Sequence, residues 1–230
     1  MRKHVYMWMI SILALCAALP GLATASDREE DISRTQRAAT VFREIVSTPD
    51  KGIPDRLLRS AKCIAIIPGD KTFALLFGGN YGRGVASCRT DHGWSAPLFL
   101  AVEGGSVGYQ VGGSSTDLVL LFMNDHALQS LVGDKFKMGA DATIAAGPVG
   151  RDAAAGTDVK FNAEILSYSR TKGIFAGVSL DGTVVEADKS GDKAMYGEDV
   201  NRHDILGGRV PPPAEAQVLL RELSAHARPS

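Results

Sequence analysis

The glycine-rich stretch FGGNYGRG, residues 77–84, has the composition of loops that cradle phosphate groups in nucleotide-binding enzymes. A P-loop, however, needs the order G-x-x-x-x-G-K-[ST], and neither Gly-Lys-Ser nor Gly-Lys-Thr occurs in this sequence. A dinucleotide-binding turn needs G-x-G-x-x-G leading from a strand into a helix. Here the next residues, Val-Ala-Ser-Cys, are typical of a strand. The stretch therefore predicts close backbone approach within a curved sheet and argues against a nucleotide site.

Ser106 is a second candidate for chemistry, because GGSVG at 104–108 matches the G-x-S-x-G pattern of serine hydrolases. That nucleophile sits on a sharp turn between a strand and a helix. Here Val107, Tyr109 and Val111 alternate as they would in a strand. No histidine in the sequence is marked as its general base. The pattern favours binding over catalysis, with no cofactor and no metal site, and leaves a serine hydrolase as the enzymatic alternative.

The first 25 residues have the three parts of a secretory signal peptide. Residues 2–3 are basic, residues 5–19 are almost wholly apolar, and Ala-Thr-Ala at 23–25 is a small-x-small cleavage site before Ser26. The apolar run is shorter than the about 20 residues that span a bilayer, which disfavours a retained anchor. Cleavage after residue 25 is therefore expected.

A lipoprotein site at Cys16 is the alternative treatment of this leader. The residue before Cys16 is the large Leu15, and further apolar residues follow, so this alternative is disfavoured. We expect a protein secreted across the inner membrane, which is periplasmic and peripheral to a membrane surface.

The charge of the mature sequence excludes one class of partner. Without Arg2 and Lys3, the 25 basic residues become 23 against 26 acidic residues, a net charge of −3 with histidine neutral. A slightly acidic protein does not offer the basic surface that a nucleic acid requires. We therefore expect no nucleic-acid partner.

Cys63 and Cys88 are the cysteines outside the leader, and each lies in a strand-like run. Two thiols in one small secreted domain favour a disulfide. A metal site that uses Cys88 and His92 is the more specific alternative, but the sequence offers no two further ligands nearby. Free thiols are the third possibility.

The elements that must position these residues fall into an N-terminal helical zone, a β-rich middle zone and a C-terminal helical zone. Residues 31–47 repeat apolar side chains with helical spacing, and a short second helix is predicted at 54–60. From about Cys63 to Glu186, short strands alternate with tight turns, interrupted by a small helix at 125–132. The expected strands are CIAII, TFALLF, GVASC, PLFLAV, SVGYQV, TDLVLLFM, EILSYS, IFAGVSL and TVVE.

The fold class that follows is α+β. Closely joined strands indicate a mainly antiparallel, glycine-rich curved sheet or barrel, with helices packed at the N- and C-terminal ends. The predicted organisation comprises a signal peptide at 1–25, a helical segment at 26–61 and a β-rich domain at 62–206. A proline-rich linker and an amphipathic helix at 207–230 complete it.

Several runs, taken in order over residues 40–206, resemble one family closely. They are LLRSAKCIAIIP, FGGNYGRGVASCR, WSAPLFLAVEGGSVGYQVGG, TDLVLLFMN, KFKMGADATIAAGPVGRDAAAGTD and AEILSYSRTKGIFAGVSLDG. They resemble the SYLF domain, a lipid-binding domain also called the yeast actin-binding type. The resemblance implies a non-enzymatic domain that binds phospholipids, in the secreted single-domain form known from bacteria. It transfers no individual lipid-contact residues.

The candidate lipid contacts therefore come from physical reasoning about the helix at 31–47. Its apolar stripe could insert at a membrane interface while Arg34 and Arg37 meet lipid phosphates. The alternative is that the stripe packs on the sheet as ordinary core. The stripe consists of Ala38, Val41, Phe42 and Ile45.

Lys135 and Lys137 form the second candidate, because they flank Phe136 and point to one face of a strand. Solvated surface is the alternative here. The sequence thus predicts a phospholipid-binding protein of the cell envelope that contacts an anionic membrane or holds a lipid. A structural protein that docks an envelope protein partner is the other non-enzymatic possibility, and the oligomeric state is undetermined.

Overall fold

The computed structural model describes residues 21–48, 52–69, 80–104, 116–150, 163–171, 174–198 and 200–227. The helices are α2 (Gly21–Val46), α3 (Asp55–Ser60), α4 (Asp125–Val132), α5 (Lys189–Tyr196), α6 (Arg202–Leu206), the 3-10 helix η2 (Ala214–Ala216) and α7 (Gln217–His226). The strands are β1 (Cys63–Ile67), β2 (Asn80–Thr90), β3 (Gly93–Trp94), β4 (Leu98–Gly104), β5 (Thr116–Phe122), β6 (Lys135–Lys137), β7 (Ile144–Ala146), β8 (Ile165–Thr171), β9 (Ile174–Gly177) and β10 (Val184–Ala187).

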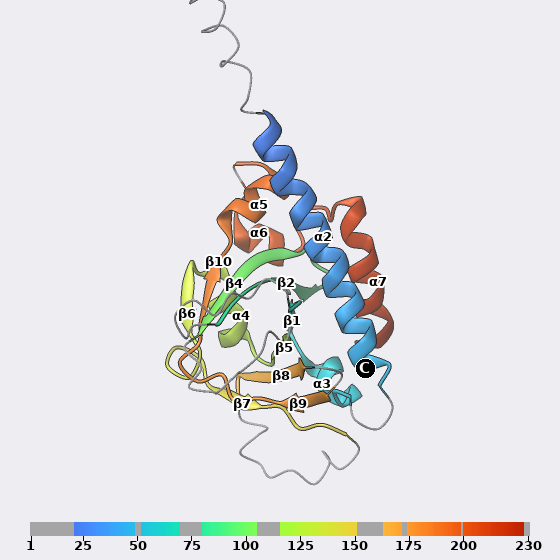
Figure 1. The fold of residues 1–230 in the computed structure, drawn as a ribbon, viewed down its shortest axis with the longest axis vertical. Helices are drawn as coiled ribbons and strands as arrows, with labels where there is room; N and C mark the ends of the chain where they lie inside the picture. The colour runs from blue at the N-terminus through green and yellow to red at the C-terminus, as the bar shows by residue number, and fades with distance from the viewer. Residues whose placement is uncertain are drawn as a thin grey trace, which may run out of the picture.

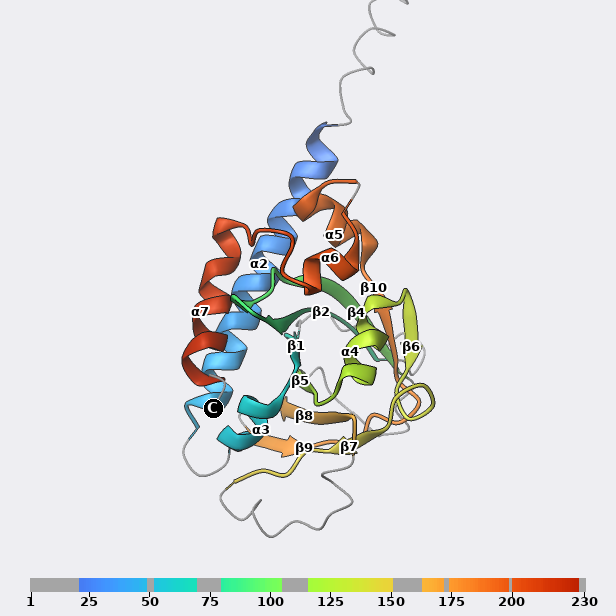
Figure 2. The same ribbon diagram turned by 180° about the vertical axis from the view of Figure 1, so that it is seen from behind.

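The strands form one curled sheet, ordered β6-β10-β4-β2-β1-β5-β8-β7, with β3 beside β2 and β9 beside β8. Every pairing is antiparallel except that of β7 with β8. Both views show the sheet curving around α4, while α2 and α7 lie outside the curl (Figure 1, Figure 2). The predicted α+β class, the mainly antiparallel curved sheet and the helices at both ends are confirmed.

Strand β1 lies at the centre of the sheet and is buried along its whole length. Ile64 and Ile66 face a core shared with α2, α3 and α7. Cys63, Ala65 and Ile67 face a second core, to which α4 and α6 contribute. Because helices cover both faces, every position of the strand is apolar, which explains why CIAII shows no alternation between polar and apolar residues.

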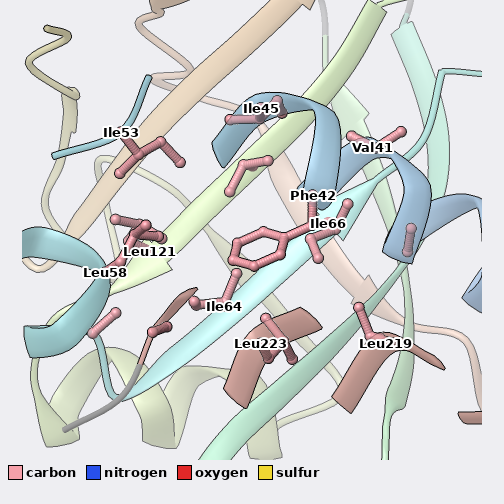
Figure 3. Close-up of a cluster of buried hydrophobic side chains, with 14 of the residues drawn as sticks. Val41, Phe42, Ile45, Ile53, Leu58, Ile64, Ile66, Leu121, Leu219 and Leu223 are labelled. Atoms are coloured by element: carbon pink, nitrogen blue, oxygen red, sulfur yellow. The ribbon is translucent and has the colours of Figure 1, made fainter. Parts of the chain in front are cut away.

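The first and last described helices pack side by side. Helix α2 contacts α7, and the side chains between them belong to the core that also covers β1. Figure 3 shows Phe42 at the middle of this cluster, beside Ile64 and Ile66 of the sheet and Leu223 of α7.

The glycines of β2 serve close packing, as the sequence predicts. A methyl group at Gly84 would lie 2.5 Å from the carbonyl oxygen of Ile66 and 2.8 Å from a side-chain carbon of Ile67. One at Gly82 would lie 2.7 Å from the side chain of Ile67. Real side chains do not approach so closely, so β1 and β2 can keep their spacing here only if β2 has glycine.

Helix α2 begins at Gly21, ten residues before the start that the apolar repeat predicts. The repeat marks only the part of the helix that packs on the sheet, and no proline interrupts residues 21–30. The predicted strands TFALLF and SVGYQV fall within 70–79 and 105–115, outside the described residues. Within the residues that the structure describes, no helix combines the length and apolar character needed to cross a bilayer.

Candidate functional site

The apolar stripe of α2 faces the sheet. Val41, Phe42 and Ile45 are buried, as is Ala38, and all four belong to the core between α2, β1 and α7. This is the position expected from the alternative interpretation, in which the stripe packs on the sheet as ordinary core. Contact with lipid stays a prediction, and it would require α2 to leave the sheet. We therefore place no lipid site on this face of the helix.

Arg34 is also buried, with 1% of its surface exposed, so it is not available to lipid phosphates in this conformation. Its Nη1 donates a hydrogen bond to Oδ2 of Asp188, at 2.7 Å. Its Nη2 lies 2.9 Å from Oδ1 of Asp31, and its guanidinium carbon lies 5.4 Å from the centre of the Phe99 ring. Arg34 therefore joins α2 to α5 and β4 inside the protein.

Asp188 receives the largest number of hydrogen bonds in this cluster. It precedes α5 and caps it, since Oδ1 accepts hydrogen bonds from the backbone N–H of Gly191 and from the hydroxyl of Ser190. Oδ2 accepts from Arg34 and from Nε of Arg83, which β2 supplies. Burial alone would raise the pKa of Asp188, but these hydrogen bonds outweigh it and hold the pKa at about 2.

Asp192 and Arg202 extend the cluster towards α4. Nη1 of Arg202 donates to Oδ2 of Asp192 at 2.7 Å and to the carbonyl oxygen of Phe99, and Nη2 donates to the carbonyl oxygen of Leu131. The backbone N–H of Phe99 donates to Oδ1 of Asp192. Burial nevertheless raises the pKa of Asp192 to about 6. The pair ties α5 and α6 to the sheet and to α4.

Arg37 is half-buried, and its Nη1 donates a hydrogen bond to the hydroxyl of Ser33 at 2.8 Å. Arg34 instead directs its guanidinium to the buried Asp188. The two predicted arginines therefore do not both present their charges to one phosphate.

Lys135 and Lys137 do lie on the surface, on the outermost strand of the sheet. Both are exposed on β6, while Phe136 between them is buried against the second core. Nζ of Lys135 is 3.7 Å from a carboxylate oxygen of Glu186, and the backbone N–H of Lys137 donates to Asp141. Because Phe136 anchors the strand, the backbone positions of the two lysines are set, and both side chains extend into solvent at the edge of the sheet.

Cys63 and Cys88 are directly opposite each other in the β1–β2 pairing. The structure places their sulfur atoms at bonding distance, 2.02 Å, and both residues are fully buried. His92 is exposed, and the described residues contain no cluster of three or more His, Cys, Asp or Glu side chains able to hold a metal ion. The disulfide itself stays a prediction until it is measured.

The shorter of two histidine–carboxylate pairs among the described residues joins His126 to Glu164 and has a structural role; the other, His226 with Glu222, lies within α7 at 3.8 Å. Nδ1 of His126 is 2.7 Å from Oε1 of Glu164, which also accepts a hydrogen bond from Asn124. Oε2 of Glu164 accepts from both the backbone and the hydroxyl of Thr143. The carboxylate thus links the start of α4 to the sheet. Ser106, the predicted alternative nucleophile, lies outside the described residues.

Sequence reasoning missed most of the buried ionic cluster. The members of this cluster are spread over more than 170 positions, and the local sequence around each one predicts an ordinary surface charge. They are Asp31, Arg83, Asp188, Asp192 and Arg202. The one local signal is at Asp188, because an aspartate directly before a helix is a good N-cap.

Comparison with known proteins identifies the family. Residues 103–226 match the family model Ysc84, described as "Las17-binding protein actin regulator". The chain is 31% identical over 200 residues to SH3 domain-containing YSC84-like protein 1 of Rattus norvegicus, which covers 84% of this chain and 58% of that protein.

Two yeast proteins are similar as well. Protein YSC84 of Saccharomyces cerevisiae is 35% identical over 204 residues, 85% of this chain and 43% of its own. LAS seventeen-binding protein 3 from the same species is 34% identical over 210 residues, 86% of this chain and 46% of its own. This chain thus spans about half the length of such relatives. With a family model that matches more than half of its length, the chain belongs to the Ysc84 family, the SYLF-domain family that its sequence resembles.

Proposed function

We propose that this protein is a non-enzymatic phospholipid-binding protein of the cell envelope, and that it contacts anionic membrane surfaces through the lysine pair of β6. Two facts support the proposal: membership in a family whose relatives are named for binding and actin regulation, and the position of Lys135 and Lys137. The lysine pair carries the argument, because these are the predicted lipid contacts whose cationic groups face solvent.

The expected strength of this contact can be worked out. Neighbouring exposed residues on one face of a strand are about 7 Å apart, so both ammonium groups can meet one layer of headgroups. A basic residue near an anionic surface contributes about 1 kcal/mol, so the pair contributes about 2 kcal/mol, or about 30-fold in partitioning. Glu186 beside Lys135 offsets part of this. A weak, reversible and salt-sensitive association follows.

Vesicle flotation tests the proposal. The purified protein should float with phosphatidylglycerol vesicles at low salt, less at high salt and little with zwitterionic vesicles, since salt screens exposed charges. The double variant K135A/K137A should lose up to about 30-fold in partitioning, and less to the extent that Glu186 offsets the charge of Lys135. K62A/K193A removes the same charge from lysines that pair with Asp125 and Glu198, and should float as the wild type does.

Three results would count against this site. Equal losses in both double variants would show that net charge matters and β6 does not. Flotation that ignores salt would replace the lysine contact with apolar insertion. An absence of flotation with every vesicle would exclude contact with a membrane surface.

An envelope location is part of the same proposal and rests on the signal sequence. A chain that starts at Ser26 would retain a helix start of its own, since Ser26-Asp27-Arg28-Glu29 has the S-x-x-E order of a capping box. Cell fractionation with N-terminal sequencing tests this part. A mature N-terminus at Ser26 in the envelope fraction is expected, and an uncut chain in the cytoplasm would refute it.

A protein partner is the second candidate function. The observation that favours it is that the family is described as Las17-binding and that one yeast relative is named for binding LAS seventeen. If the protein fails to float with any vesicle yet recovers one defined envelope protein in crosslinking, this second function replaces the first.

A further inference from the structure

Asp31 of α2 is a buried carboxylate with poor compensation. It is 2% exposed, and its nearest cation is Nη2 of Arg34, 2.9 Å from Oδ1. That nitrogen is one of the buried atoms without a hydrogen-bond partner, because its orientation towards Asp31 is unfavourable. Across the ranges that the structure describes, no residue donates a hydrogen bond to the Asp31 carboxylate. A buried charge without hydrogen bonds destabilises the packed state.

The cations near Asp31 are shared with other acids. Arg34 gives its hydrogen bond to Asp188, at 2.7 Å, and Arg83 donates to both Asp188 and Glu30. The neighbouring groups therefore comprise three carboxylates, counting Asp31, and two guanidinium groups. The negative charge of Asp31 also contributes to the raised pKa of Tyr196 on α5, after burial and Asp192. One negative charge is left in excess at the junction of α2, β2 and α5.

We propose that Asp31 is a proton-binding site, and that its protonation in mildly acidic solution tightens the attachment of α5 to α2. The proton removes the excess charge and leaves the Arg34–Asp188 and Arg83–Asp188 contacts intact. The contact between α2 and α5, which we call the clasp, is then more stable in acid than at neutral pH. This inference goes beyond lipid binding and does not depend on it, because the proton acts inside the protein.

The electrostatics of the junction agree in direction. Burial raises the pKa of Asp31 to about 6, with Arg34 lowering it and Asp188 raising it. The ordinary value in an unfolded chain is 3.8, so the folded state binds more protons between these two values. Stability is therefore gained as the pH falls through about 6, is complete below about 3.8 and is lost as the pH rises again.

Asp192 titrates in the same range and must be separated from Asp31. Burial raises its pKa to about 6 although Arg202 and the N–H of Phe99 both lower it. Asp188 has its pKa at about 2, so its effect lies outside the range from pH 5 to pH 7.5.

Urea unfolding of the purified protein without lipid, at pH 7.5 and pH 5, tests the proposal. Each of the two carboxyls should raise the folding equilibrium constant about tenfold between these values. Asp31→Asn should remove one tenfold step, Asp192→Asn the other, and the double variant should show little response. Asp134→Asn removes an exposed aspartate that pairs with Lys189, and should keep the full response.

Two results would overturn the proposal: a wild-type protein that loses stability between pH 7.5 and pH 5, or an Asp31→Asn variant with the full wild-type response. A carboxyl titration followed by carbon NMR in the wild type covers a variant that fails to fold. Titration of Asp31 near 6 supports the clasp, and titration near 3.8 overturns it. Hydrogen exchange of α5 amides, corrected for intrinsic rates, should slow at pH 5 in the wild type. In Asp31→Asn it should slow less, because only the step from Asp192 remains, and in the double variant it should change little.

Discussion

Replacement of Phe42 by alanine tests whether α2 belongs to the core. The ring is fully buried among Ile64, Ile66 and Leu223, and it meets the His226 ring edge-on with 6.4 Å between centroids. Removal of a buried phenylalanine side chain destabilises proteins by about 3–5 kcal/mol, because apolar contacts are lost and a cavity remains. Domains have total stabilities of about 5–15 kcal/mol, so the loss should be severe. Thr40→Ala, at an exposed position of the same helix, should cost less than about 0.5 kcal/mol.

The assay is urea unfolding followed by tryptophan fluorescence. Trp94 belongs to the same core as Phe42, and the other tryptophan, Trp8, lies in the predicted signal peptide. A Phe42→Ala loss below about 1 kcal/mol, with an unchanged dependence on urea, would refute the packing argument. If that variant kept its stability but lost flotation, the stripe would be a lipid contact after all.

Further predictions concern the packing of the sheet, the N-cap of α4, the stability at low pH and the disulfide. Gly84→Ala should cost about 1–3 kcal/mol in urea unfolding, because its methyl group would overlap the backbone of β1; an unchanged midpoint would contradict this. Asn124→Ala removes the side chain that accepts the N–H of residue 127 and should cost about 1 kcal/mol, measured as a lower melting temperature, with the exposed Gln129→Ala as control. Because hydrogen bonds hold the pKa of Asp188 at about 2, its contribution to the free energy of unfolding should persist above pH 4 and disappear as the pH falls towards 2. In Asp188→Asn, stability should therefore fall less steeply with pH over this range. A fall as steep as that of the wild type would count against the assignment. The unreduced protein should lack two hydrogens by mass, and replacing both Cys63 and Cys88 by alanine should cost about 3 kcal/mol for a loop of this size, whereas two alkylatable thiols would exclude the bond.

The sheet could be predicted because its signals are local. Short apolar runs separated by glycine, asparagine and aspartate identify strands, and short connections require antiparallel neighbours. The sequence also narrows the cap of α4 to Asn124 or Asp125, since a cap and its helix adjoin in sequence, and the structure has Asn124. The order of strands was not readable, because β1 pairs with β5 across more than 50 residues.

The candidate site was harder to predict, for two physical reasons. An amphipathic stripe such as that around Phe42 has the same spacing whether it covers a sheet or a membrane, so the sequence leaves both open. The contact of Arg34 with Asp188 joins residues 154 positions apart, and neither has a local feature that marks it as buried. By contrast, alternation around Phe136 did place the two lysines of β6 on the exposed face.

The side-by-side packing of α2 and α7 has a consequence for the order of events in the life of the chain. Arg43 and Glu222, which meet across these helices, are separated by 179 residues. The core above β1 can therefore close only after the residues of α7 have been made. Until then the apolar side of α2 lacks the cover that α7 provides, and the growing chain exposes this part of it to other proteins. A chain that stops before Leu219 should stay open, however complete its sheet.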